Sequence, residues 1–187
     1  MNFIKLDKAG GTVKRIYIIS GPAGVGKSTT SRRLAELFEH SAYIEGDLLN
    51  HMVIGGYLPP WESEESLSLV WDNIADLSIN FAKANHHVII DYVAFPEEIE
   101  KLSQKIYAEV SEIEVIYVVL WVDKAELLKR DALRIKEHQM GERCLELAQE
   151  FESKGIEKRF VLDTTNLKQT DLDDILLEIR GNPRFRY

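Results

Sequence analysis

The sequence contains a single cysteine, Cys144, so no disulfide can form within the chain, and we expect a reducing compartment. Long apolar runs are also missing. The longest, residues 115–122, has 8 residues, whereas a helix that crosses a bilayer needs about 20. Residues 1–14 lack the apolar stretch of about 7–15 residues that a secretion signal requires. We therefore expect a cytoplasmic protein with no membrane partner.

An excess of positive charge is missing too. Lys and Arg number 23 against 31 Asp and Glu, which gives a formal net charge of −8. A protein that binds duplex nucleic acid needs a basic face, so we expect no nucleic-acid partner. A local basic pocket for phosphate is still compatible with this balance.

The composition that is present belongs to an ordinary globular protein, with 45% hydrophobic and 29% charged residues in 187. A chain of this length buries roughly 70% of its unfolded surface, which supports a full core. We expect a single domain over residues 1–187, with tails at 1–14 and 181–187.

Short β-rich apolar runs alternate with helical patterns along the chain. Strands are expected at residues 16–19, 41–44, 88–93, 115–122 and 159–162. Helices are expected at 27–39, 47–54, 63–85, 96–110, 124–149 (interrupted near Met140-Gly141) and 171–179. This alternation predicts an α/β fold: a doubly wound, five-stranded parallel sheet of order 2-3-1-4-5 with helices on both faces.

One motif carries a specific chemistry. Residues 21–28 match G-x-x-x-x-G-K-[ST], the P-loop or Walker A motif, directly between the first strand and the first helix. Backbone N–H groups of such a loop surround phosphate, the lysine reaches the β- and γ-phosphates, and the serine hydroxyl binds Mg²⁺. The residues predicted to contact ATP here are Gly21, Pro22, Ala23, Gly24, Val25, Gly26, Lys27, Ser28 and Thr29.

Two aspartates lie where strands end. Asp47 follows the second strand and is a possible general base for an acceptor hydroxyl, or else the N-cap of the helix that follows it. Asp91 lies in the third strand, where it either assists Mg²⁺ together with Ser28 or is a buried structural group. The two functional roles are interchangeable at this stage.

Three arginines follow the fourth strand. Arg130 and Arg134 are four residues apart, which predicts one shared helix face, and Arg143 follows the Met140-Gly141 interruption. Arginines stabilise the charge of a transferring phosphoryl group, so residues 130–146 are predicted to form a lid over ATP. The alternative is a solvated helix whose cations are balanced by nearby acidic residues.

These features together resemble the small P-loop kinases of the gluconate kinase, shikimate kinase and chloramphenicol phosphotransferase group. The resemblance rests on residues 21–28, the Gly46-Asp47 pair and the arginine-bearing segment, and its architecture covers about residues 15–180. The runs 44–52 and 139–144 are similar to bacterial proteins described as gluconate kinases or AAA-type P-loop ATPases.

The resemblance implies further contacts. It places the loop at 163–166 beside adenine, with Thr165 and Asn166 as binding residues, although an Asx turn is the alternative for this loop. The acceptor is expected between Asp47 and residues 50–71. Its pocket would be lined by His51, Tyr57, Trp61 and Asn73, with Trp71 assigned to the core.

The function predicted from the sequence is ATP- and Mg²⁺-dependent transfer of phosphate to a hydroxyl group of a small molecule. Lys27, Asp47, Arg130 and Arg134 are its predicted catalytic residues. The partners are ATP and the acceptor, and the protein is expected to be a monomer or homodimer. One alternative is a nucleotide or nucleoside kinase; another is an ATP-gated switch that binds a protein partner.

Overall fold

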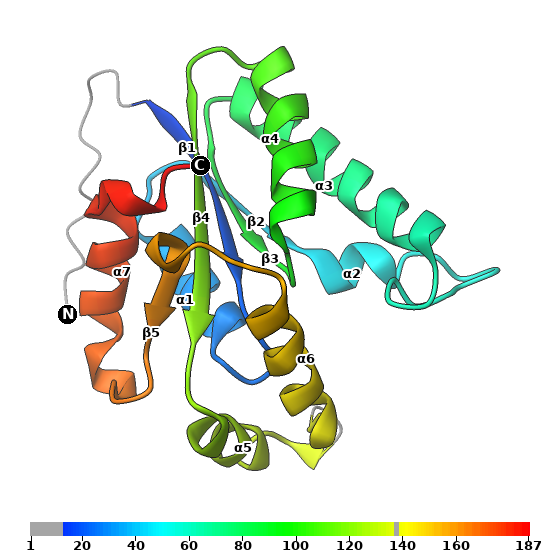
Figure 1. Ribbon diagram of the computed structural model, residues 1–187. Coiled ribbons are helices and arrows are strands. Elements are labelled where there is room, and N and C mark those ends of the chain that lie inside the picture. The colour runs from blue at the N-terminus through cyan, green and yellow to red at the C-terminus, as the bar shows by residue number, and fades with distance from the viewer. Residues whose placement is uncertain (1–12, 137–138) are drawn as a thin grey trace.

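A five-stranded parallel sheet forms the centre of the protein, in a computed structural model that describes residues 13–136 and 139–187 (Figure 1). The strands are β1 (Lys14–Ser20), β2 (Ser41–Glu45), β3 (His87–Asp91), β4 (Ile113–Trp121) and β5 (Val161–Asp163). Their spatial order is β2-β3-β1-β4-β5, and all four pairings are parallel. The predicted sheet and its strand order are therefore confirmed.

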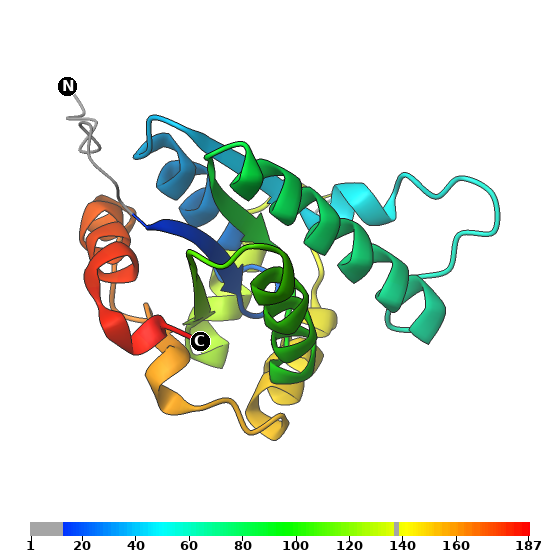
Figure 2. The same cartoon turned by 90° about the horizontal axis from the view of Figure 1, so that it is seen from above.

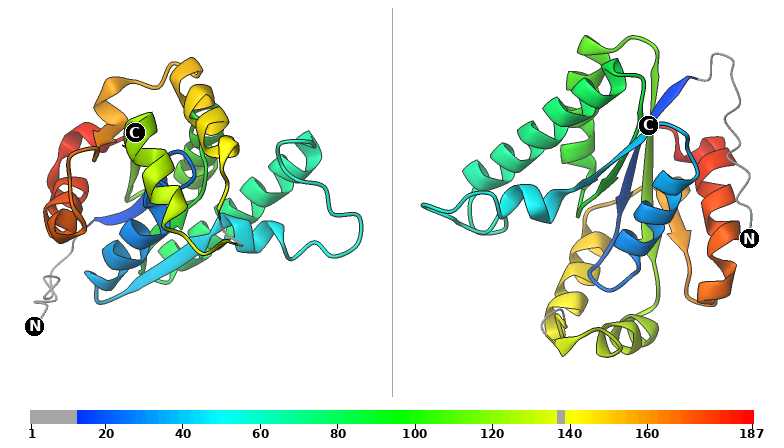
Figure 3. Two further views of the ribbon diagram at one scale, coloured as in Figure 1. Left: turned by 90° about the horizontal axis from the view of Figure 1, so that it is seen from below. Right: turned by 180° about the vertical axis from the view of Figure 1, so that it is seen from behind.

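Helices cover both faces of the sheet (Figure 2). One face packs against α3 (Glu64–Lys83) and α4 (Pro96–Glu109), and the other against α1 (Lys27–Glu36) and α7 (Leu172–Gly181). Near the end of β4 lie α5 (Lys124–Ala132) and α6 (Glu142–Ser153), while α2 (Gly46–Asn50) extends away from the end of β2 (Figure 3). Short 3-10 turns complete the chain: η2 (Lys158–Phe160), η3 (Gln169–Asp171) and η4 (Pro183–Phe185).

The first strand shows why the sheet needs two helical layers. Ile16 and Ile18 belong to the core beneath α3 and α4, whereas Tyr17 and Ile19 belong to the core beneath α1 and α7. All four side chains have no exposed surface. A continuous apolar run is the pattern of a strand that is buried on both faces, and β1 has both the run and the burial that it predicts.

The C-terminal segment differs from its prediction. Residues 181–187 are not a tail: Phe185 is fully buried, Arg186 forms a bridge with Ile116, and Tyr187 donates its backbone N–H to the Val115 carbonyl. Two aromatic residues in a polar stretch supply the apolar area that holds it. At the other end, β1 already starts at Lys14, and residues 1–12 of the predicted N-terminal tail lie outside the described residues.

Strand register then places the functional segments together. Asp91 lies beside Ile19 on one side and beside Glu45 on the other, so β1, β2 and β3 end at the same edge. The P-loop leaves β1 at this edge, and Asp47 follows β2 there. Ligands of open α/β sheets bind at this carboxyl edge. In the part of the chain that the structure describes, no helix is long and apolar enough to cross a membrane.

Candidate active site

The P-loop has the backbone that its sequence predicts. Gly21 and Gly26 have backbone φ angles of 133° and 108°, which residues that carry a Cβ rarely adopt. A Cβ on Gly21 would also lie 2.3 Å from the Leu120 carbonyl oxygen. Gly26 is the residue that precedes α1, so the helix begins at Lys27 and directs its N-terminal N–H groups into the loop.

Lys27 is held at the centre of this loop. Its ammonium donates to the carbonyl oxygens of Gly21, at 2.9 Å, and Pro22, at 3.0 Å. Burial lowers the pKa of Lys27, and the nearby carboxylates of Asp91 and Asp47 oppose that shift. The approach of Arg134 lowers the pKa of Lys27 further. The structure thus brings two predicted carboxylates and one predicted arginine close to the P-loop lysine.

Asp47 lies in the first turn of α2 and does not cap it. The N-cap is Glu45, and no side chain accepts a capping hydrogen bond there, so the N-cap alternative for Asp47 is wrong. Burial raises the pKa of the Asp47 carboxyl, while Lys27 counteracts this. Within the described residues no hydrogen bond engages the carboxylate, and the residue keeps an exposed face, so surrounding protein desolvates the carboxyl only in part. Both features suit a group that accepts a proton.

Asp91 is buried, with 5% of its surface exposed, and accepts a hydrogen bond of 2.7 Å from the Tyr43 hydroxyl. Burial together with Asp91 raises the pKa of Tyr43, so the phenol stays a donor. Asp91 therefore has a structural partner, Tyr43, in addition to its place near Lys27, and nothing in the local sequence predicted this partner. The hard oxygen donors of Asp91 and exposed Ser28 fit Mg²⁺, which proteins bind through one or two carboxylates plus phosphate.

The described residues contain no cluster of three or more His, Cys, Asp or Glu side chains able to hold a metal by themselves. A metal at this edge would therefore need oxygens from the nucleotide, in agreement with the limited donor set of Ser28 and Asp91.

The arginine segment departs from its prediction. Helix α5 ends at Ala132, so Arg130 and Arg134 do not share a helix face. Arg130 donates to Glu126, to the Val25 carbonyl of the P-loop and to the Thr164 carbonyl, at 2.9, 3.2 and 3.0 Å. It therefore joins the P-loop to the loop at 163–166, whereas Arg134 is close enough to Lys27 to act on its charge. Residues 137–138 of the predicted lid lie outside the described residues.

Asp131 explains why the helix stops, and the sequence analysis did not identify it. Its carboxylate accepts from the backbone N–H groups of Met140 and Gly141 and from the Arg134 guanidinium. Only 3% of its surface is exposed. Burial would raise the pKa of this carboxyl, but the hydrogen bonds from Gly141 and Met140 outweigh it and lower the pKa. One signal was available: Asp131 lies four residues after the buried Leu127, on the inner face of α5.

We expect Asp131→Asn to loosen the segment between α5 and α6. The amide has one acceptor oxygen in place of two, so it cannot accept both backbone N–H groups in the same way. Hydrogen exchange at residues 139–147 should accelerate on the order of tenfold, the equivalent of one charge-assisted hydrogen bond. The matched control is Asp123→Asn, because Asp123 caps α5 and asparagine caps equally well. Equal acceleration in both variants would contradict the assignment.

The other predicted ligands have mixed placements. Arg143 pairs with Glu146 and lies with its guanidinium 5.7 Å from the ring centre of Trp61, so it faces the loop after α2. Thr165 accepts a backbone hydrogen bond from Asp123, and Asn166 is exposed. Asp163 accepts from the Thr165 N–H, which confirms an Asx turn, although the last helix is preceded by Asp171 and not by this turn.

Gly46 fixes where Asp47 lies. A Cβ at Gly46 would be 2.4 Å from the ring of Tyr92, which packs edge-on against the buried Trp71. The core position predicted for Trp71 is confirmed. Close approach of the α2 backbone to this ring therefore requires glycine.

Gly46→Ala should accordingly destabilise the protein by about 1–3 kcal/mol, the usual cost of overpacking, because the Tyr92 ring has packed neighbours. Chemical denaturation measures the difference. Gly55→Ala is the control, since a Cβ there meets nothing within 4 Å. A Gly46→Ala variant as stable as the control would show that α2 shifts without cost.

A family model described as an AAA domain matches residues 18–157, which is most of the chain and includes the P-loop, both aspartates and the arginine segment. The chain belongs to this AAA domain family. A comparison with curated protein sequences gives no significant match.

Several solved structures share the fold of this AAA domain. A gluconokinase from Sinorhizobium meliloti 1021 has a TM-score of 0.63 at 18% identity, with 90% of this chain and 91% of that chain covered. A sugar kinase from Janibacter sp. HTCC2649 has a TM-score of 0.62 at 16% identity, with coverages of 92% and 97%. The APS kinase CysC of Mycobacterium tuberculosis, in complex with AMPPNP and APS, has a TM-score of 0.56 at 19% identity, with coverages of 90% and 99%. The fold is that of P-loop NTPases, as predicted.

Proposed function

We propose that this protein is a kinase that transfers the γ-phosphoryl group of ATP to a hydroxyl group of a small molecule. One observation carries the proposal: β1, β2 and β3 end at one edge of the sheet, which brings Asp91, Asp47 and the P-loop lysine Lys27 together there, with Arg134 close enough to act on Lys27. Phosphoryl transfer needs a cation at the phosphates, a base at the acceptor and donors for the developing charge, and this cluster supplies all three. The fold shared with a gluconokinase, a sugar kinase and an APS kinase supports the same chemistry.

In this proposal each residue has a separate role. The P-loop N–H groups and Lys27 bind the phosphates, and Arg134 approaches them from the α5–α6 segment. Asp47 accepts the acceptor's hydroxyl proton while the oxygen bonds to phosphorus and ADP leaves with the bond electrons. Ser28 and Asp91 would hold Mg²⁺, which neutralises phosphate charge when bound. Arg130, Thr165 and Asn166 belong to the adenine side.

A metabolite screen tests the proposal. The melting temperature of the protein with Mg²⁺ and a non-hydrolysable ATP analogue is measured in the presence of each compound. A ligand that binds only the folded state raises the stability of that state. Compounds that shift the melting temperature are then tested for ADP formation with ATP. Acceptor-dependent ADP release supports a kinase. ATP turnover that no compound stimulates, together with nucleotide-dependent binding of a protein, would support the switch alternative instead.

The arginine segment gives a further prediction. Arg134 lies near Lys27, and Arg143 lies near Trp61 in the loop after α2. Charge-assisted hydrogen bonds from arginine to phosphate are roughly twice as strong as neutral hydrogen bonds. Hydrogen exchange at residues 139–147 should therefore slow with an ATP analogue and much less with adenosine, which has no phosphates. Equal protection by both compounds would show that the segment responds to the base alone.

A further inference from the structure

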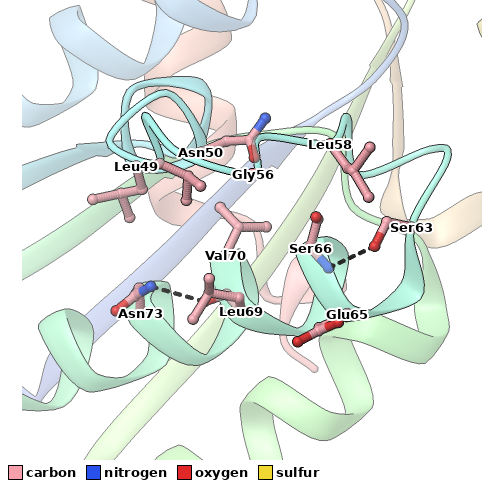
Figure 4. Close-up of a pocket in the computed structure, with 11 residues that line it drawn as sticks. Leu49, Asn50, Gly56, Leu58, Ser63, Glu65, Ser66, Leu69, Val70 and Asn73 are labelled. Carbon is pink, nitrogen blue, oxygen red and sulfur yellow. Dashed lines mark hydrogen bonds between the residues drawn. The ribbon is translucent and has the colours of Figure 1, made fainter.

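A pocket of about 230 Å³ lies between α2, the loop that follows it and the first half of α3 (Figure 4). Five of its eleven lining residues are aliphatic: Leu49, Val53, Leu58, Leu69 and Val70. Leu58 and Leu69 are also half exposed to solvent, with 53% and 48% of their surfaces accessible. Water-exposed aliphatic side chains around a hollow indicate a ligand with an apolar part.

The polar part of the lining connects this pocket to Asp47. Asn50 is three residues after Asp47 on α2, so the two share a helix face, and Asn50 donates a hydrogen bond of 3.2 Å to the Tyr57 hydroxyl. His51 donates its backbone N–H to the Asp47 carbonyl at 3.0 Å, and its ring centre lies 5.8 Å from that of Tyr57, so Tyr57 and Asp47 flank the same turn of the chain. A molecule in the pocket could therefore present a hydroxyl group to Asp47.

The Asp, Glu, Lys and Arg side chains of the segment that forms this pocket are all acidic. Residues 46–82 contain six carboxylates and neither lysine nor arginine: Asp47, Glu62, Glu64, Glu65, Asp72 and Asp76. Lys105 pairs with Asp72 and Asp76, but within the described residues no ion pair neutralises Glu65, which lines the pocket. Arg143 reaches the outer loop at Trp61, is paired with Glu146, and does not line the pocket. Among the described residues that line the pocket none is a lysine or an arginine, so a carboxylate or phosphate on the apolar part of the ligand would meet no such cation in the lining.

We propose that this pocket binds the apolar part of an alcohol that carries no negative charge, either uncharged or with a protonated amine. This rests on the proposed function and names its substrate class. Sites that recognise carboxylate or phosphate use arginine or lysine, and like charges brought together cost several kcal/mol of binding. The pocket therefore disfavours sugar acids and phosphorylated acceptors, and with them the nucleotide kinase alternative, while its aliphatic side chains accept a ring or a short chain.

Three probes with one carbon frame test the charge preference: 3-phenyl-1,2-propanediol, which is neutral, phenylalaninol, which is cationic at pH 7, and 3-phenyllactate, which is anionic. Calorimetric titration uses the full chain with Mg²⁺ and a non-hydrolysable ATP analogue. The diol and the amino alcohol should bind at least about tenfold more tightly than the hydroxy acid. Equal or tighter binding of 3-phenyllactate, or binding of none of the three, would overturn the proposal.

Variants locate the binding to the pocket. Ser66→Phe places a ring in the hollow and should abolish binding of the diol, whereas Ser68→Phe, two residues along α3 and outside the lining, should leave it intact. Glu65→Lys should strengthen binding of 3-phenyllactate about tenfold, and the matched Glu64→Lys should not. Unchanged affinities in Ser66→Phe or in Glu65→Lys would count against this site.

These titrations measure binding without turnover, so they separate the two proposals. If the probes bind in the expected order and no acceptor is ever phosphorylated, the kinase proposal fails and the pocket assignment stands. If the protein phosphorylates an anionic acceptor that Ser66→Phe excludes, the pocket assignment fails and the kinase proposal stands.

Discussion

Lys27→Ala is expected to reduce ATP turnover by about 10³-fold or more, the scale seen when one preorganised donor to a developing negative charge is removed. The ammonium is the only side-chain cation within residues 21–28, and it donates to two loop carbonyls at the point where the proposed function puts the phosphates. Turnover is measured as ADP release with an acceptor found by the screen, and affinity by titration with an ATP analogue.

The fold should survive this change. Burial lowers the pKa of Lys27, which means that the folded protein disfavours its charged form relative to the unfolded chain. Removing the charge therefore does not remove a stabilising group, and the melting temperature without nucleotide should be at least that of the wild type. The added stability from nucleotide should be lost. Lys83→Ala, which removes an equal charge at the exposed end of α3, is the control.

Near-native turnover of Lys27→Ala would contradict the assignment of the P-loop as the catalytic centre. A lowered melting temperature would instead show that the two carbonyl contacts stabilise the loop more than burial of the charge destabilises it.

The sheet and the P-loop could be predicted because the local sequence determines both. Apolar runs such as residues 88–90 are long enough to identify buried strands, and the G-x-x-x-x-G-K-S spacing fixes the loop between a strand and a helix. Parallel strands end at one edge, so the approach of Asp47 and Asp91 to Lys27 also follows from the topology.

The remaining features depend on contacts between distant residues. Helical periodicity continues past Ala132, yet the helix ends there because Asp131 binds backbone N–H groups nine and ten residues further on. Likewise the 181–187 segment is polar in composition, but Phe185 fills a place in the core beneath α1 and α7. No local propensity contains this information, since each feature results from packing.

Asp47→Asn is the second substitution for which we expect a large loss of activity. If Asp47 accepts the acceptor's proton, its replacement should lower kcat by about 10²–10⁴-fold, the usual contribution of a general base. Affinity for the ATP analogue should change little, because the carboxylate acts on the acceptor. Asp72→Asn on the exposed side of α3 is the matched control and should keep normal activity. A large loss of nucleotide and Mg²⁺ binding would instead assign Asp47 to the metal and leave Asp91 as the base.

The pKa of Asp47 gives this prediction a second, independent readout. Burial raises that pKa above its usual value near 3.8, so a base at this position loses activity at higher pH than an ordinary aspartate would. The wild-type kcat/KM should fall as the pH drops through this raised pKa, and Asp47→Asn should lack that limb. For stability the sign is opposite: above the raised pKa the folded state carries an unfavourable charge, but solvent screens this exposed residue, so Asp47→Asn should melt at the wild-type temperature or slightly above it at pH 7. A variant that loses both activity and stability would indicate a structural role. Removal of a catalytic charge that is unfavourable in the folded state should lower the rate without lowering the stability.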